Sequence, residues 1–271
     1  MRTLKNHIIL FDAECPMCKL YTQAFVKTQM LDANGRASYQ QIPEVACPYI
    51  DRQRAANEIA LLNTETGEVN YGITSLFKVL GHAFPVFKPL FAFVPFQWFM
   101  SKVYAFISYN RRVIVPANQQ QEKVAYQPQF QLHYRLVYLA FTWIFTGFIL
   151  SNYGQMLNAY IPGASWSREY LICGGQIFFQ GAVVFFLNRE KLWQYLGNMM
   201  TISFAGALLL TPLLVLHHFF SIPAIISVIY FLAVAGLMLL EHIRRLKLIE
   251  ANHFLSISWV TYRILILLLI L

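Results

Sequence analysis

The sequence predicts an α/β domain at the N-terminus followed by an all-α bundle of transmembrane helices. Of the 271 residues, 57% are hydrophobic and only 13% are charged, whereas soluble domains carry about 45–50% apolar and about 25% charged residues. Most charged residues precede Arg135, and long apolar runs fill the remainder of the chain. The composition therefore argues against a wholly soluble fold and indicates two regions that face different solvents.

The first predicted elements are a strand and a helix. Residues 7–11 form a short apolar run that ends at the acidic Asp12, and residues 19–31 have the pattern of a helix. The tetrapeptide Cys-Pro-Met-Cys, residues 15–18, lies between the two. We therefore expect a strand, a turn that carries two cysteines, and a helix, in that order.

Three further segments predict the rest of a sheet. A turn at Asn34-Gly35 precedes the second strand, and Thr66-Gly67 joins the third and fourth strands as a hairpin. Thr74 and Ser75 are expected to cap a helix that ends near Gly81. These three strands are predicted at residues 37–42, 59–62 and 68–71. The order of strands and helices suits a thioredoxin-like sheet.

Residues 84–106 are rich in Phe, Trp and Tyr but contain three prolines, Pro85, Pro89 and Pro95. A proline inside a helix removes a backbone hydrogen bond and breaks or kinks the helix, so this stretch does not predict a regular membrane-spanning helix. Aromatic rings are favoured at the interface between membrane and water. We therefore expect residues 84–106 to lie against the membrane interface.

Residues 115–131 are polar and rich in glutamine. Such a segment cannot bury enough apolar surface to fold alone. We interpret residues 115–132 as a polar linker between an N-terminal thioredoxin-like domain, residues 1–114, and a membrane domain, residues 133–271.

Five apolar segments follow this linker, and each approaches the ~20 residues that cross the hydrocarbon core of a bilayer. They lie at residues 136–152, 170–187, 199–220, 222–240 and 257–271. The last segment is short and contains Arg263. We therefore expect four to five transmembrane helices.

The basic residues indicate how these helices are oriented. Lys and Arg gather in the connections 188–197 and 241–256, and Arg111 and Arg112 are assigned to the membrane flank before the first span. Flanking charge explains the net charge of +8, so nucleic acid is not expected as a partner. By the positive-inside rule the N-terminal domain faces the cytoplasm. We expect a multi-pass protein of a bacterial inner membrane.

The two cysteines of residues 15–18 are the predicted reactive groups. Unpaired backbone donors and the helix dipole favour a thiolate at a helix N-terminus, which makes Cys15 the expected nucleophile. Cys18 lies one turn further along and is expected to attack a mixed disulfide formed at Cys15. Asp12 is either the proton acceptor for Cys18 or the cap of the turn. Glu14 disfavours a very low pKa of Cys15, which indicates a reductant rather than a strong oxidant.

Two motifs in this part of the chain resemble a known family. Residues 12–18, Asp-Ala-Glu-Cys-Pro-Met-Cys, resemble the start motif of the DCC family of thioredoxin-like proteins, and residues 104–111, Tyr-Ala-Phe-Ile-Ser-Tyr-Asn-Arg, are similar to its closing helix. The resemblance covers about residues 8–113, and Ala13 departs from the glycine usual in the family. It implies a thioredoxin-like fold and a thiol–disulfide oxidoreductase that uses Cys15 and Cys18.

Other roles for these side chains stay open. A zinc site would need Cys47, His7 or His82 beside the cysteine pair, and Cys47 alone is expected to be a buried small residue. Gln176 and Gln180 lie one turn apart in a predicted span, where they either bond a neighbouring helix or line a site. Interfacial positions, rather than a haem or quinone site, are expected for histidines 133, 217, 218, 242 and 253.

The sequence therefore predicts a membrane-anchored thiol–disulfide oxidoreductase, with no cofactor and no metal. Its expected partners are a disulfide-containing protein or a small thiol substrate, the lipid bilayer and an unknown electron donor. Two other functions fit the same residues. The dithiol domain is the redox input of a transport or electron-transfer protein, or the whole chain is a non-catalytic membrane adaptor.

Overall fold

A computed structural model describes residues 2–41, 50–117, 126–161 and 165–270. Most of these residues are helical, and a small mixed sheet lies in the N-terminal part. Contacts divide the chain into two compact units, Met1–Tyr134 and Arg135–Leu271. The two units are described separately as unit 1 and unit 2.

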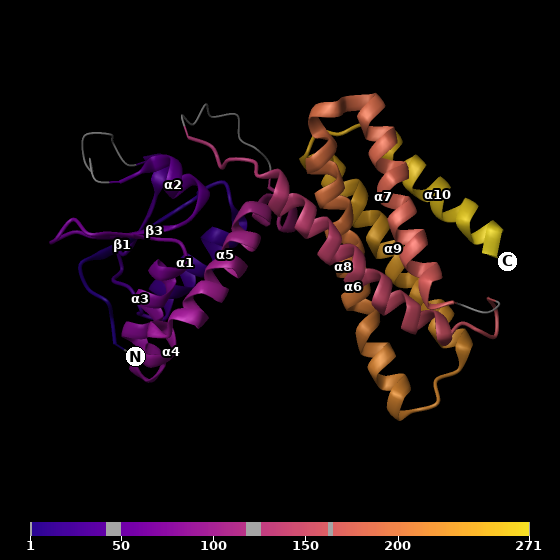
Figure 1. The fold of residues 1–271 in the computed structure, drawn as a ribbon, viewed down its shortest axis with the longest axis horizontal. Helices are drawn as coiled ribbons and strands as arrows, with labels where there is room; N and C mark the ends of the chain where they lie inside the picture. Colours follow the sequence, from indigo (N-terminus) through magenta and orange to yellow (C-terminus); the bar gives the residue numbers. More distant parts are fainter. Residues whose placement is uncertain (1, 42–49, 118–125, 162–164, 271) are drawn as a thin grey trace. The chain divides into compact units, whose positions relative to one another are not determined.

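The sheet of unit 1 has four strands in the order β2-β1-β3-β4 (Figure 1). Strand β1 (His7–Phe11) is parallel to β2 (Arg36–Ser38) and antiparallel to β3 (Ala60–Asn63). Strand β4 (Val69–Tyr71) pairs with β3 as an antiparallel hairpin. The predicted strand at residues 7–11 and the predicted hairpin are therefore confirmed.

Helices cover both faces of this sheet, because successive side chains of a strand point to opposite faces. Ile9 and Leu61 pack with α1 (Pro16–Lys27) and α3 (Ile73–Ala83) on one face. Leu10 and Ala60 pack with Tyr39 and with α2 (Arg52–Asn57) on the other. The buried core of unit 1 thus lies in two layers, one on each side of β1 and β3.

Two local predictions for unit 1, the end of the second strand and the helix cap, were wrong, and one helix was not predicted. Strand β2 ends at Ser38, because residues 39–41 turn into the 3-10 helix η1 (Tyr39–Gln41), and α2 was not predicted. Helix α3 begins at Ile73 after Gly72, which has a φ of 61° that favours glycine, and it ends at Ala83, close to the predicted end near Gly81. Thr74 and Ser75 do not cap α3; their hydroxyls donate to the carbonyls of residues 71 and 70.

The aromatic segment forms two short helices and one long helix, each of which has a proline in its first turn. These are η3 (Pro85–Phe87), α4 (Lys88–Ala92) and α5 (Val94–Ile114). Proline is tolerated in the first turn of a helix because the backbone N–H there has no partner within the helix. The prolines therefore begin helices, and the two parts of the segment are bent by 89°.

The polar segment predicted as a linker is partly attached to unit 1. Gln53 Nε2 donates to the carbonyl of Gln127, and the backbone N–H of Gln129 donates to Asn57 Oδ1 at 2.8 Å. Arg112 also donates to Gln127 Oε1. Glutamine side chains and backbone groups of the described part of this segment thus find polar partners on α2 and α5.

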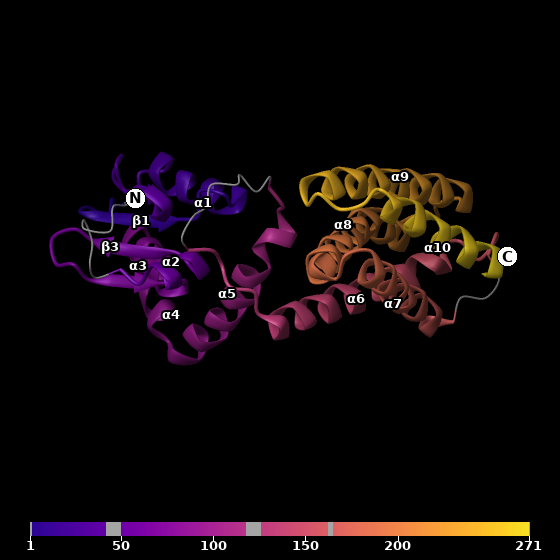
Figure 2. The same cartoon turned by 90° about the horizontal axis from the view of Figure 1, so that it is seen from above.

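Unit 2 is a bundle of long helices with α8 at its centre (Figure 2). Tyr138 of α6 and Thr201 of α8 share a buried hydrogen bond, and α8 also packs against α7 and α9. The helices are α6 (Leu132–Gln155), α7 (Trp166–Asn188), α8 (Leu192–Phe219), α9 (Ala224–Leu248) and α10 (Phe254–Ile270), with the turn η4 (Arg189–Lys191) between α7 and α8.

Three helical stretches among the described residues are long and apolar enough to cross a membrane: Leu132–Gln155, Trp166–Phe219 and Ala224–Leu248. The second contains both α7 and α8, which fold back on each other at η4. A fourth is reached only if the bent pair Pro85–Ala92 and Val94–Ile114 counts as one span. Helix α10 is apolar but shorter, with 17 residues. The chain therefore has the helices of a membrane protein.

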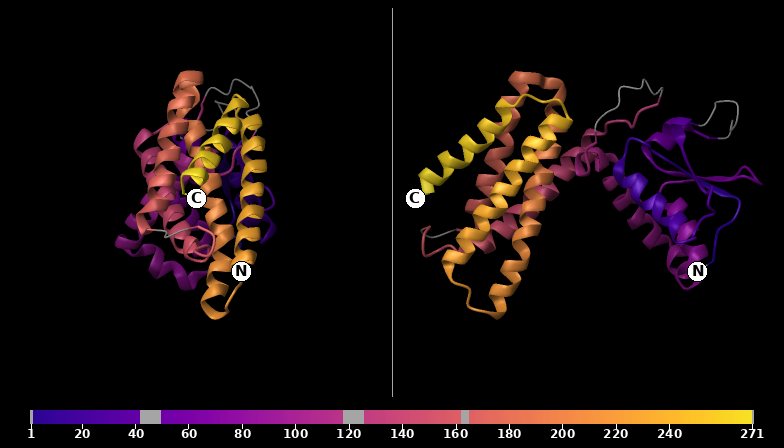
Figure 3. Two further views of the ribbon diagram at one scale, coloured as in Figure 1. Left: turned by 90° about the vertical axis from the view of Figure 1, so that its right-hand side faces the viewer. Right: turned by 180° about the vertical axis from the view of Figure 1, so that it is seen from behind.

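The two basic connections of unit 2 lie at the same end of the bundle (Figure 3). The ammonium group of Lys191 in η4 donates hydrogen bonds to the carbonyls of Ile249 and Glu250, at 2.9 and 2.6 Å. These two residues follow α9. These residues belong to the connections 188–197 and 241–256, which the sequence analysis placed on one side of the membrane. The contact joins α7, α8, α9 and α10 at this end.

Candidate redox site

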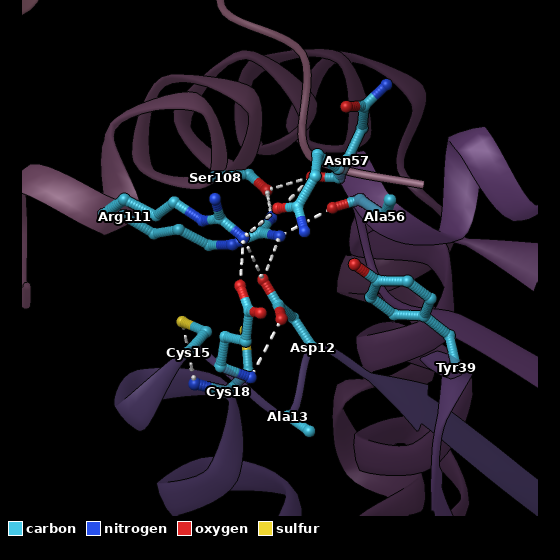
Figure 4. Close-up of polar contacts among 12 residues, drawn as sticks. Asp12, Ala13, Cys15, Cys18, Tyr39, Ala56, Asn57, Ser108 and Arg111 are labelled. Carbon is cyan, nitrogen blue, oxygen red and sulfur yellow. Dashed lines mark hydrogen bonds and ion pairs between the residues drawn. The ribbon is translucent and has the colours of Figure 1, made fainter. Parts of the chain in front are cut away.

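The two cysteines lie where the chain passes from β1 into α1. Cys15 is the N-cap of α1, with extended backbone angles, and Pro16 occupies the first turn. The backbone N–H of Cys18 donates to Cys15 Sγ at 3.4 Å (Figure 4). Both are free thiols, and Cys15 is only 2% exposed. The local sequence thus places Cys15 against the unpaired donors at the start of α1.

The pKa values of the two thiols are shifted in opposite directions. The pKa of Cys15 is lowered to about 6, mainly because the Cys18 thiol donates a hydrogen bond to it, with the Cys18 N–H and the charge of Arg111 adding to the effect against burial. The pKa of Cys18 is raised for the matching reason, and burial raises it further. These shifts favour a thiolate at Cys15 and a protonated thiol at Cys18.

The carboxylate of Asp12 is fully occupied by donors beneath the cysteine turn. Its Oδ1 accepts from the backbone N–H of Glu14 at 3.0 Å and from Gln40 Nε2 at 2.9 Å. Its Oδ2 accepts from Arg111 at 3.0 Å, and Arg112 lies 3.6 Å away. The bond to Glu14 is the cap of the active turn, so this geometry favours capping over proton transfer as the role of Asp12.

Arg111 is a residue of the site that the sequence analysis missed. Its guanidinium donates to Asp12 Oδ2, to the carbonyls of Ala56 and Asn57, and to Ser108 Oγ. The residue is only 4% exposed. Its assignment to the membrane flank was therefore wrong, because the last turns of α5 pack beside Asp12 (Figure 4).

Arg112 balances the second acidic residue of the turn. Its guanidinium pairs with Glu14 Oε2 at 3.0 Å and lies near Asp12. Glu14 was expected to disfavour the Cys15 thiolate by its negative charge. Arg112 partly compensates that charge, so the effect of Glu14 on the thiolate is weaker than expected. The backbone N–H of Ala13 donates to Gln40 Oε1. Ala13 has no positive φ, so its position in the turn does not require glycine.

The described residues contain no group of three or more His, Cys, Asp or Glu side chains that could hold a metal ion. His7 Nδ1 bonds the carbonyl of Lys5, and His82 Nε2 bonds the carbonyl of Thr3. Cys47, the third cysteine considered for a zinc site, lies outside the described residues. Cys15 and Cys18 lie together in the first turn of α1, with no third ligand beside them among the described residues.

Unit 2 contains a buried polar cluster of its own. Tyr195 donates to Gln180 Oε1 at 2.8 Å and lies 3.1 Å from His242 Nε2. His242 also bonds Ser256 and is only 1% exposed, so it packs inside the bundle near the end of α9. Gln180 bonds neighbouring helices as predicted. The amide of Gln176 is buried and has no hydrogen-bond partner among the described residues.

Comparisons with known proteins add no relative to this description. No family model, no curated protein and no solved structure matches the chain. What the site does is therefore argued from its own chemistry.

Proposed function

We propose that the protein is a membrane-anchored thiol–disulfide oxidoreductase that uses the Cys15/Cys18 dithiol. The observation that carries the proposal is the position of Cys15 at the N-cap of α1, where the Cys18 backbone N–H donates to its Sγ; the opposite shifts of the two thiol pKa values agree with it. A thiolate is the nucleophile in disulfide exchange, and a nearby protonated thiol is the group that completes it. A buried cysteine pair with only a packing role needs neither property.

In the proposed reaction the Cys15 thiolate attacks one sulfur of a substrate disulfide. A mixed disulfide forms at Cys15, and the other substrate sulfur leaves as a thiolate that takes up a proton. Cys18 then loses its proton to the solution and attacks Cys15 Sγ. The second substrate thiol is released, and Cys15 and Cys18 form a disulfide. The substrate disulfide is reduced to two thiols by the two electrons of the dithiol.

Arg111 supports this reaction electrostatically. Its charge lowers the pKa of both thiols, so it favours the thiolate that attacks in each of the two steps. Asp12 holds the guanidinium in place and caps the turn with its other oxygen. We assign Arg111 and Asp12 as positioning residues, with Cys15 as nucleophile and Cys18 as resolving cysteine.

The resemblance to the DCC family supports the same proposal. Its two motifs, residues 12–18 and 104–111, are joined by the ion pair between Asp12 and Arg111. The element order, the reversed direction of β3 and the helices on both faces of the sheet fit a thioredoxin-like domain. Membership of the family and a cytoplasmic location of this domain are parts of the proposal.

The experiment equilibrates the purified full-length protein against defined ratios of reduced and oxidised glutathione and traps free thiols. We expect a reversible two-electron couple, near the ~−270 mV of thioredoxin for a reductant. Cys15→Ser should abolish exchange, and Cys18→Ser should accumulate a mixed disulfide at Cys15. Absence of a reversible couple, or cellular function that persists in both serine variants, would contradict the proposal and favour an adaptor.

A further inference from the structure

The bend between α4 and α5 presents a dense group of exposed apolar side chains. Val94 is 72% exposed and Trp98 is 64% exposed, one helical turn apart. Large exposed apolar patches mark surfaces that meet a protein or a membrane. We call this group the aromatic corner; it consists of Val86, Phe87, Leu90, Phe93, Val94, Trp98 and Phe99.

The inner side of the aromatic corner is firmly packed on unit 1. Phe91 and Phe96 stack on Phe77 of α3, with ring centroids 4.5 and 5.7 Å apart. Gln97 Nε2 donates to the carbonyl of Phe91 across the bend. Gly81 leaves room for α4, since a Cβ there would lie 3.3 Å from the Phe91 ring. The outer rings are thus held in exposed positions by an ordered support.

Helix α5 is fixed to the sheet domain along its length and therefore does not cross a bilayer. The backbone N–H of Ile59 donates to the Tyr104 hydroxyl at 3.0 Å. Ser108 donates to the carbonyl of Asn57, and Arg111 pairs with Asp12. A helix with these contacts cannot also be surrounded by lipid. The bent pair is better explained as a domain helix with an apolar tip.

The charge around the aromatic corner identifies its partner. No acidic residue occurs between Glu68 and Glu122. Lys88 and Lys102 are exposed at the corner, and the Lys102 ammonium lies 6.0 Å from the Trp98 ring centroid. Aromatic rings favour the membrane interface, and nearby lysines attract anionic head groups. This combination fits an anionic lipid surface better than a soluble protein.

The chain itself keeps a bilayer within reach. The 17 residues between α5 and α6 would span at most about 60 Å when fully extended, and the bonds of Gln127 and Gln129 to unit 1 shorten this reach. The apolar helices of unit 2 begin directly after them. A tether of this length raises the effective concentration of the corner at the surface of the same bilayer, so even weak lipid binding becomes efficient.

We propose that the aromatic corner docks unit 1 onto the anionic surface of the bilayer that holds the helices of unit 2. Phe93, Val94 and Trp98 enter the interfacial region, and Lys88 and Lys102 meet lipid head groups. The proposal does not depend on the chemistry of the cysteines. A second copy of the chain on the same surface is the competing outcome.

The test uses full-length protein in liposomes that contain anionic lipid. Trp98 becomes the single tryptophan when Trp143, Trp166, Trp193 and Trp259 are replaced by Phe. Lipids brominated near the head group should quench its fluorescence, and aqueous iodide should not. The matched control is Leu20→Trp with all five native tryptophans replaced, since Leu20 on α1 is 72% exposed but lies outside the corner. The control should respond to iodide only.

Three results would overturn the proposal. Quenching of Trp98 by iodide alone would show that the aromatic corner lies in water. Stronger quenching by bromine at the chain ends than near the head groups would make the segment a re-entrant span. Protection from both quenchers that disappears when the protein is diluted over more vesicles would make the corner an interface between copies.

Two further measurements remove the dependence on a heavily substituted chain. Trp98→benzoylphenylalanine in the otherwise native protein should cross-link to labelled lipid on illumination, and Leu20→benzoylphenylalanine should not. Lys88→Glu with Lys102→Glu should reduce the cross-linked yield on anionic vesicles. Lys19→Glu with Lys27→Glu, two exposed positions on α1, should leave it unchanged. Equal yields for all of these variants would contradict lipid docking.

Discussion

Single residues of the site combine a local motif with a distant partner. Cys15, Cys18 and Asp12 lie within seven residues, whereas Arg111 is 99 residues from the aspartate that it pairs with. Both members of the pair are almost completely buried. A buried ion pair keeps its charges only with further hydrogen bonds, and Ala56, Asn57, Ser108 and Glu14 provide them.

The lowered pKa of Cys15 predicts an unusual pH dependence of its alkylation. Only the thiolate reacts, so the rate of reaction with iodoacetamide should reach half of its maximum near pH 6. For an ordinary cysteine this midpoint lies near pH 8.5. At pH 7 the ionised fraction should be roughly 30 times that of an ordinary cysteine. The measurement is the rate of labelling of Cys15 between pH 5 and pH 9, in a Cys47→Ser background.

Cys18→Ala provides the control for this profile. Alanine removes the thiol that donates to Cys15, which is the largest cause of the lowered pKa. The midpoint should therefore move to higher pH. A midpoint near pH 8.5 in both proteins would mean that the Cys15 thiolate is not stabilised by this contact.

Replacing Arg111 should damage both stability and reactivity. Arg111→Met leaves the Asp12 carboxylate buried without its partner, which costs about 3–5 kcal/mol, and it should raise the midpoint of Cys15 alkylation. Hydrogen exchange at the amides of β1 and β3 measures the loss of stability. Arg112→Gln is the matched control, because Arg112 is partly exposed and its removal leaves the contact between Arg111 and Asp12 in place, so the loss should be smaller. Equal effects of the two variants would argue against a special role of Arg111.

At this scale the sequence predicted what is local and missed what is distant. Cys15 and Cys18 were found because a helix start and its cysteines are neighbours in the chain. Arg111 and Arg112 follow an apolar segment, which is also where membrane-flanking charges occur. The packing of α5 beside Asp12 separates these two roles. The motif at residues 104–111 ends at Arg111, but the motif alone does not show which side chain Arg111 contacts.

Helices and strands follow their local signals where those signals are strong. The apolar run at residues 7–11 is β1, and the hairpin around Thr66-Gly67 is β3 and β4. Thr74 and Ser75 gave a false helix start, because their hydroxyls bond the carbonyls of the preceding turn. The prolines of residues 85–95 gave correct breaks, yet each break opens a new helix. A proline thus indicates a helix boundary, but the sequence alone does not show whether the helix precedes or follows it.

The glycines of unit 2 differ in what their missing side chains allow. A Cβ on Gly147 of α6 would lie 2.6 Å from the ring of Tyr170, whereas a Cβ on Gly236 of α9 meets nothing within 4 Å. Gly147→Ala should therefore lower the thermal midpoint of the bundle in detergent, with a cost of about 1–3 kcal/mol. Gly236→Ala should be neutral or slightly stabilising, since alanine is the better helix former. A reversed order of the two midpoints would contradict the packing of α6 on α7.

At the scale of the whole molecule, the basic residues of unit 2 gather in two of its connections. The contact between Lys191 and the residues after α9 brings both basic connections to one end of the bundle. The connections α6–α7 and α8–α9 lie at the other end (Figure 1). The basic connections and the other two connections thus lie at opposite ends of unit 2, and the side of the membrane that each end faces stays a prediction.

A labelling experiment tests that orientation. Single cysteines are introduced at Asn252, after α9, and at Asn158, after α6, in a chain whose four native cysteines are replaced by serine; both positions are exposed. A membrane-impermeant maleimide should reach Asn252→Cys only in inverted vesicles and Asn158→Cys only in intact cells. The opposite result would place the basic end, and with it the proposed cytoplasmic domain, on the far side.

At the scale of the whole chain, composition was the most informative signal. The excess of apolar residues after Arg135 predicted helices that can cross a membrane, and each of the five expected segments overlaps one of α6 to α10. Residues 220, 222 and 223 fall outside the helices, and residue 271 lies outside the described residues. The buried contact of His242 with Tyr195 was not predictable, because a histidine near the end of an apolar run has the same sequence signature at an interface as in a core.

Helix α5 carries the aromatic corner near its first residue and Arg111 near its last. Trp98 and Arg111 are 13 residues apart, which at 1.5 Å per residue corresponds to about 20 Å along one rigid helix. If the aromatic corner lies on lipid, the length of α5 limits the distance between the lipid head groups and the dithiol. Substrates would then be selected by the height of their disulfide above the bilayer, before any recognition of the sequence around it.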